Sequence, residues 1–148
     1  MKVAIYSRGL DFEQENPIQL LLEELMRYDT TIFIFSTLLE QYHFDPHICQ
    51  KLIPFSVSEQ LTEDIDILIS LGGDGTMLDA VTLVNNKNIP LLGINFGRLG
   101  FLASISRDEL SIAVDALIKQ NCNDDDNDND DIFGNKGTEI QGKDKLCY

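Results

Sequence analysis

Residues 68–78, which read LISLGGDGTML, are the stretch around which the rest of the chain is organised. The largely apolar run 65–71 predicts a short buried strand, and two glycines end it just before a pattern of helical spacing begins. Glycines at such a junction let backbone N–H groups approach a phosphate because no Cβ intervenes. The start of the following helix adds partial positive charge. The stretch therefore predicts a strand–turn–helix unit that can face an anion.

Asp74 is the ionisable residue of this turn. A carboxylate repels phosphate, so Asp74 suits a different task, which is to hold or deprotonate a hydroxyl group. Glycine and aspartate are also the ordinary residues of turns, and the same letters could mark a plain connection between a strand and a helix. The position of the whole block between strand and helix favours the functional interpretation.

Strand-like and helix-like patterns alternate along residues 1–120. Strands are expected at 2–7, 31–35, 65–71 and 90–94. Helices are expected from Asn16-Pro17, just after the two glycines at 72–73, and from a capping box at Ser106 to about Gln120.

Between these elements, residues 37–64 predict one short helix near 38–42 and irregular chain around Pro46 and Pro54. The alternation as a whole indicates an α/β fold, a three-layer Rossmann-like parallel sheet with helices on both faces. Ligands of such sheets bind at the carboxyl ends of the strands.

Composition excludes several classes of protein. The 148 residues suit one domain, and the hydrophobic share of 43% is enough for a core. A formal net charge of −14 and a pI near 4.2 make nucleic acid and anionic membranes poor partners. The sequence lacks a signal-peptide pattern and an apolar run of membrane-spanning length. We therefore expect a cytoplasmic protein with no membrane partner.

The character of the chain changes at residue 121. Residues 121–131 consist of asparagine and aspartate apart from one cysteine, a composition that cannot bury enough apolar surface to become ordered. We expect an α/β domain over 1–120 and a disordered acidic tail over 121–148.

Two stretches resemble known motifs, a P-loop and a metal site, but lack residues that these motifs require. Residues 137–143 fit the first positions of a P-loop, but Asp144 stands where Ser or Thr must bind magnesium. His43 and His47 are four residues apart with Cys49 nearby, but Pro46 lies between them and no further ligand cluster follows. No metal-ligating residues are therefore predicted.

The block Gly72-Gly73-Asp74-Gly75-Thr76, followed at 93–102 by GINFGRLGFL, resembles the ATP-dependent NAD kinase family. The first block is shared with a wider group that includes diacylglycerol kinases, sphingosine kinases and phosphofructokinase-like enzymes. The second block, at this distance from the first, resembles NAD kinases more than it resembles the lipid kinases. The resemblance covers residues 1 to about 120 and the order of their elements.

This resemblance implies phosphoryl transfer from ATP to the 2′-hydroxyl of the adenosine ribose of NAD, which gives NADP, with a divalent cation such as Mg²⁺. It implies roles for six residues: Asp74 as the general base, Gly75 in contact with the dinucleotide, Gly72, Gly73 and Thr76 in the phosphate-facing turn, and Phe101 near the adenine. Core packing explains Phe101 equally well. A homo-oligomer is implied for a full-length member.

The chain also departs from the family pattern. Family members continue into a mostly β domain that carries an Asn-Glu pair, and no such pair follows Gln120. We expect a truncated or frame-shifted member that could be inactive alone. Two alternatives stay open: a non-catalytic nucleotide-binding or subunit-capping module, and a lipid or sugar kinase of the wider group.

Overall fold

The fold was analysed in a computed structural model, which describes residues 1–9, 16–94, 107–122 and 146–147. Their strands form one sheet in the order β3-β2-β1-β4-β5-β6, and every neighbouring pair is parallel. The strands are β1 (Lys2–Tyr6), β2 (Thr31–Phe35), β3 (Leu52–Phe55), β4 (Ile67–Leu71), β5 (Leu91–Ile94) and β6 (Leu146–Cys147).

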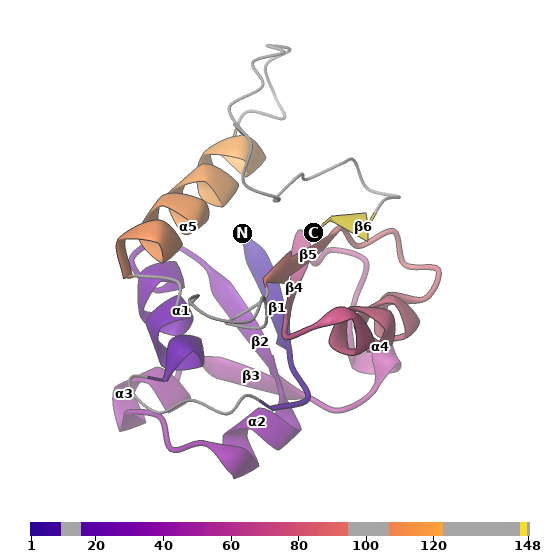
Figure 1. The fold of residues 1–148 in the computed structure, drawn as a ribbon, viewed down its shortest axis with the longest axis horizontal. Helices are drawn as coiled ribbons and strands as arrows, with labels where there is room; N and C mark the ends of the chain where they lie inside the picture. The colour runs from indigo at the N-terminus through magenta and orange to yellow at the C-terminus, as the bar shows by residue number, and fades with distance from the viewer. Residues whose placement is uncertain (10–15, 95–106, 123–145, 148) are drawn as a thin grey trace.

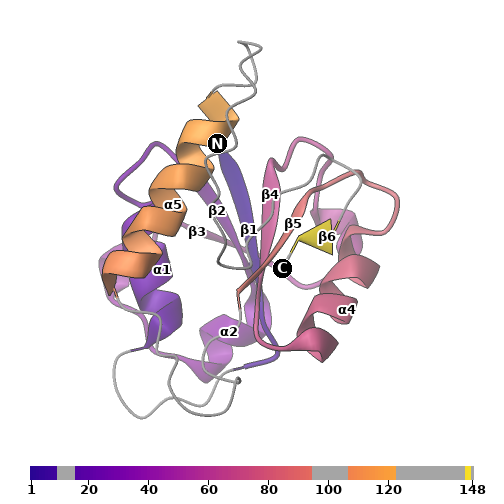
Figure 2. The same ribbon diagram turned by 45° about the horizontal axis from the view of Figure 1, so that its top comes forward.

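Helices cover both faces of this sheet, as Figures 1 and 2 show: α1 and α5 lie side by side on one face, and α4 lies on the other. The helices are α1 (Pro17–Leu25), α2 (Ser36–Gln41), α3 (Pro46–Cys49), α4 (Asp74–Val84) and α5 (Arg107–Cys122), with a short 3₁₀ helix, η1 (Ser58–Gln60). The expected three-layer α/β architecture is therefore confirmed.

Alternate residues of the central strands enter two separate apolar cores. In β1, Val3 and Ile5 pack in the core beneath α1 and α5, whereas Ala4 and Tyr6 pack in the core beneath α4. Because both faces are covered, the strands read as continuous apolar runs rather than as an alternating pattern. The five residues of β4 are all buried for the same reason.

The order of the strands creates a switch point between β1 and β4. From β1 the chain builds β2 and β3 on one side, and it then returns to place β4 and β5 on the other. The segments that follow β1 and β4 therefore leave the same edge of the sheet in diverging directions. In open α/β sheets this is where ligands bind.

Most expected elements are present, and the expected cap of α1 is confirmed because Asn16 Oδ1 accepts a hydrogen bond from the Ile18 N–H at 3.0 Å. The prediction of irregular chain around Pro46 and Pro54 was wrong. Pro46 begins α3, and Pro54 lies in β3, which has β2 as its only partner among the described strands. An edge strand can contain proline because one of its sides needs no ladder hydrogen bonds.

The structure describes two features close to and beyond residue 121, where the acidic tail is expected to begin. Helix α5 continues to Cys122, and Leu146–Cys147 pair with β5 as the short strand β6. The other residues of the expected disordered tail, and the expected helix cap Ser106, lie outside the described residues. Within the described part of the chain, no helix is both long and apolar enough to cross a bilayer.

Candidate functional site

The turn from Gly72 to Gly75 connects the carboxyl end of β4 to the first residues of α4. Gly72 has a φ of +144°, and Gly73 is the N-cap residue of α4 with extended backbone. A positive φ of this kind is accessible to glycine at little cost and strained for other residues. The first glycine of the block is therefore what allows the chain to turn directly from strand to helix.

Thr76 packs against the inside of this turn. It is buried, and its Oγ1 lies 2.6 Å from the place that a Cβ on Gly72 would occupy. Apart from its two chain neighbours, no described residue has an atom within 4 Å of the corresponding place on Gly73. The two adjacent glycines thus have different surroundings: Gly72 faces a packed side chain, whereas Gly73 faces open space.

Asp74 is the first residue of α4, and its side chain is exposed. The N-cap residue Gly73 makes no side-chain capping hydrogen bond, and the first helical hydrogen bond runs from the Met77 N–H to the Gly73 carbonyl oxygen at 3.1 Å. The N–H groups of the first turn have no acceptor within the helix itself. The arrangement places an accessible carboxylate beside backbone donors that favour an anion.

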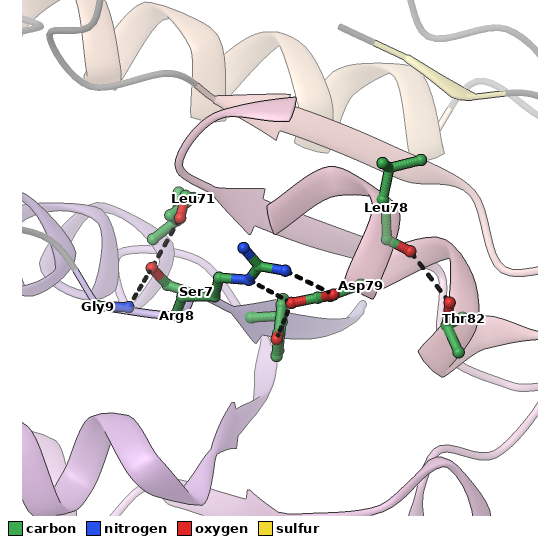
Figure 3. A network of polar contacts seen from close by, with 8 residues as sticks. Ser7, Arg8, Gly9, Leu71, Leu78, Asp79 and Thr82 are labelled. Carbon is green, nitrogen blue, oxygen red and sulfur yellow. Dashed lines mark hydrogen bonds and ion pairs between the residues drawn. The ribbon is translucent and has the colours of Figure 1, made fainter. Parts of the chain in front are cut away.

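Hydrogen bonds from both neighbouring strands hold the turn in place. The Ser7 hydroxyl, just after β1, donates to the Leu71 carbonyl oxygen at 2.7 Å and accepts from the Gly9 N–H at 3.1 Å (Figure 3). On the other side, the Gly72 N–H donates to the Ile94 carbonyl oxygen at 3.0 Å. The buried Ser7 therefore fixes the end of β4 relative to β1, across the switch point.

A second polar connection links the end of β1 to α4. The Arg8 guanidinium binds both carboxylate oxygens of Asp79, and its Nη2 lies 2.9 Å from Oδ1 (Figure 3). The Tyr6 hydroxyl donates to Asp79 Oδ2 at 2.9 Å. Tyr6 is buried and packs edge-on against Phe35, with ring centroids 4.8 Å apart. Asp79 is thus anchored to the core on one side and holds an exposed cation on the other.

The pKa values of this group follow from the same contacts. Burial, reinforced by the hydrogen bond to Asp79, raises the pKa of Tyr6 to about 12, so the phenol stays a neutral donor at physiological pH. The Arg8 guanidinium, followed by the Tyr6 hydroxyl, holds the pKa of the Asp79 carboxyl below its ordinary value. Asp79 therefore remains a charged acceptor throughout the neutral range.

We expect this lowered pKa to make the contribution of Asp79 to stability depend on pH. A carboxyl that titrates lower in the folded chain than in the unfolded chain stabilises the fold above its unfolded pKa and loses that effect as pH falls. The free energy of unfolding of the unmodified chain should exceed that of Asp79→Asn more at pH 7 than at pH 3. Urea denaturation of both proteins at several pH values measures this difference, and a difference that does not change with pH would contradict it.

The structure brings five of the six predicted site residues together in a single turn: Gly72, Gly73, Asp74, Gly75 and Thr76. The sixth, Phe101, lies outside the described residues, as does most of the second motif.

Sequence reasoning missed Arg8 and Asp79. Arg8 follows the first strand by two residues. This position at the carboxyl edge of the sheet could have identified it as a candidate site residue. No such sequence signal identifies Asp79, because only the packing of α4 against the sheet brings it to Arg8.

Comparisons with known proteins show which sequences this chain resembles. The sequence profile of the ATP-NAD kinase N-terminal domain matches residues 50–122. An NAD kinase of Christiangramia forsetii is 32% identical over 120 residues, which cover 81% of this chain and 41% of that protein. An NAD kinase of Porphyromonas gingivalis is 36% identical over 121 residues, with 79% and 40% covered. One of Gemmatimonas aurantiaca is 56% identical over 63 residues, with 41% and 22% covered. The chain thus spans about two fifths of the length of the first and second of these relatives.

Proposed function

The chain belongs to the NAD kinase family, and we propose that it acts in that family's reaction, phosphoryl transfer from ATP to NAD to give NADP. The observation that carries the proposal is the position of Asp74: an exposed carboxylate at the start of α4, directly after the central strand β4 and at the switch point of the sheet. A ligand bound at this edge would meet the carboxylate and the backbone donors of the turn together.

In the proposed reaction Asp74 holds the 2′-hydroxyl of the adenosine ribose of NAD. The 2′-oxygen forms a bond to the γ-phosphorus of ATP, and the bond from that phosphorus to the bridging oxygen breaks. ADP leaves with the electron pair of that bond, and the hydroxyl proton passes to Asp74 and then to water. Most of the catalytic effect in such a transfer comes from positioning and from stabilisation of negative charge. The rigid turn supports both.

Each residue of the turn has a proposed part in this reaction. Gly75 contacts the dinucleotide beside Asp74, and Gly72 and Thr76 hold the shape of the turn. Gly73 leaves room for the ligand, because a Cβ there would meet no atom of the described residues within 4 Å apart from its two chain neighbours. We also propose that Phe101 packs near the adenine.

A divalent cation such as Mg²⁺ is part of the proposal, and when bound it neutralises charge on the phosphates. No group of three or more His, Cys, Asp or Glu side chains among the described residues could hold a metal ion. We propose that the phosphates of ATP supply many of the ligands of the cation, which is how Mg²⁺ is commonly bound. The proposal also includes a cytoplasmic location and, for a full-length member, assembly into a homo-oligomer.

The test is an assay of the purified 148-residue chain with ATP, Mg²⁺ and either NAD or diacylglycerol. We expect NADP from NAD and no phosphorylated lipid. Phosphorylation of diacylglycerol alone would instead assign the chain to the lipid kinases of the wider group. Binding of NAD and ATP without turnover would identify a non-catalytic nucleotide-binding module.

A further inference from the structure

The Arg8 guanidinium lies against the turn that carries Asp74. A Cβ built on Gly75 would be 2.9 Å from Arg8 Nη1, 3.5 Å from Cζ and 3.8 Å from Nη2. The charged group of Arg8 therefore packs beside the Cα of the residue that follows Asp74. A side chain at position 75 would displace the guanidinium, and this explains why a glycine suits this position.

Asp79 leaves one edge of this guanidinium available. Nε and Nη2 donate to the two oxygens of Asp79, while Nη1 has no hydrogen-bond partner among the residues that the structure describes. Figure 3 shows the guanidinium extended between the end of β1 and α4, with two of its nitrogens directed at Asp79. The side chain of Arg8 as a whole is 58% exposed.

The anchoring of Asp79 makes the orientation of Arg8 specific. Asp79 accepts from the buried Tyr6 as well as from Arg8, and the fork geometry of the two Arg8 bonds fixes the plane of the guanidinium. A free guanidinium edge matches the spacing of phosphate oxygens. Because the chain has 25 acidic and 11 basic residues, a nucleotide that binds here needs local positive charge.

We propose that Arg8 binds a phosphate group of the nucleotide at the Asp74 turn and that Asp79 is the positioning residue that aims Arg8 at it. This inference rests on the proposed function, because it names a further residue of the same site. The phosphate could belong to ATP or to the pyrophosphate of NAD, and the two share the chemistry that Arg8 recognises.

Calorimetric titration of the 148-residue chain with ATP and, separately, with NAD tests the proposal at constant Mg²⁺. Loss of one charge-assisted hydrogen bond predicts that Arg8→Ala raises the Kd for at least one of the two nucleotides by about 10-fold to 100-fold. Asp79→Asn should raise the same Kd by a smaller factor. Arg8→Lys should be intermediate, because an ammonium keeps the charge but cannot bind Asp79 through a fork.

Lys119→Ala is the matched control. Lys119 is also an exposed cation paired with an aspartate, Asp115, at 2.6 Å, but it lies on α5 and away from the turn. The Lys119→Ala variant removes one positive charge, as Arg8→Ala does, and we expect it to leave both Kd values unchanged. Thermal unfolding of every variant identifies the temperature at which all of them remain folded for titration.

A spectroscopic measurement on the unmodified chain distinguishes contact between Arg8 and the nucleotide from a purely structural role of Arg8. The guanidinium ¹⁵N–¹H signal of Arg8, assigned by its loss in Arg8→Lys, should shift when ATP or NAD is added. A signal that does not move overturns the inference, even if the variants bind more weakly. Nucleotide binding that is equal in the unmodified chain and in Arg8→Ala also overturns it, while the proposed function stands. An unmodified chain that binds neither nucleotide overturns both.

Discussion

Asp74→Asn is expected to lower the rate of NADP formation by about 10²-fold to 10⁴-fold, the range that a positioned general base commonly contributes. Asparagine has nearly the same shape but cannot accept the proton of the 2′-hydroxyl. The fold should survive, since the side chain is exposed and caps no helix. The expected cost in stability is the loss of a favourable charge at a helix N-terminus, about 0.3–1 kcal/mol. Initial rates with NAD, ATP and Mg²⁺ measure the first effect and urea denaturation the second.

Asp45→Asn is a suitable control for this experiment. Asp45 is likewise an exposed aspartate at the start of a helix, where it is the N-cap residue of α3 and makes no side-chain capping hydrogen bond. Both variants remove one negative charge from a comparable position. We expect Asp45→Asn to retain full activity. Equal rates for Asp74→Asn and the unmodified chain would exclude Asp74 as the general base.

Gly72→Ala is expected to destabilise the fold by about 1–3 kcal/mol, the usual cost of forcing a residue into a sparsely populated backbone region. The added Cβ would also lie 2.6 Å from Thr76 Oγ1 and 3.1 Å from its Cβ. Because Thr76 is buried, it has little room to move away. The turn should therefore shift, and NADP formation should fall together with the free energy of unfolding.

Gly73→Ala is the matched comparison because it adds the same methyl group one residue later. Gly73 has a φ of −92° and a ψ of −163°, and in the described part of the chain no atom beyond its two chain neighbours lies within 4 Å of the new Cβ. We expect its free energy of unfolding to stay close to that of the unmodified chain, although the methyl group would occupy the approach to the turn. The double variant Gly72→Ala/Thr76→Ala separates the causes in part: it removes the contacts of the new Cβ with Oγ1 and Cγ2 of Thr76 and should recover the loss due to them. The loss due to φ should remain. Equal destabilisation by Gly72→Ala and Gly73→Ala would contradict this account of the turn.

Strand β3, like Arg8 and Asp79, was not predicted from the sequence. It shows what local sequence patterns cannot predict. Pro46 and Pro54 argue against regular structure when each is read alone. Pro54 is nevertheless paired with Ile34, because β3 lies at the edge of the sheet. Whether a strand is central or at an edge depends on the order of all the strands, and no local window contains that information.

The sequence by itself determined the layered α/β fold and the position of Asp74, because both depend on short-range chemistry. Continuous apolar runs mark strands covered on both faces, and a glycine that must adopt a positive φ marks the turn that carries the carboxylate. Only the tertiary structure placed Arg8 beside Gly75 and joined it to Asp79 and Tyr6. That contact joins residues separated by up to 73 positions, and it forms because β1 pairs with β4 at the switch point and α4 packs back on them. Contacts of this kind depend on which strands become neighbours, a property of the whole chain rather than of any segment.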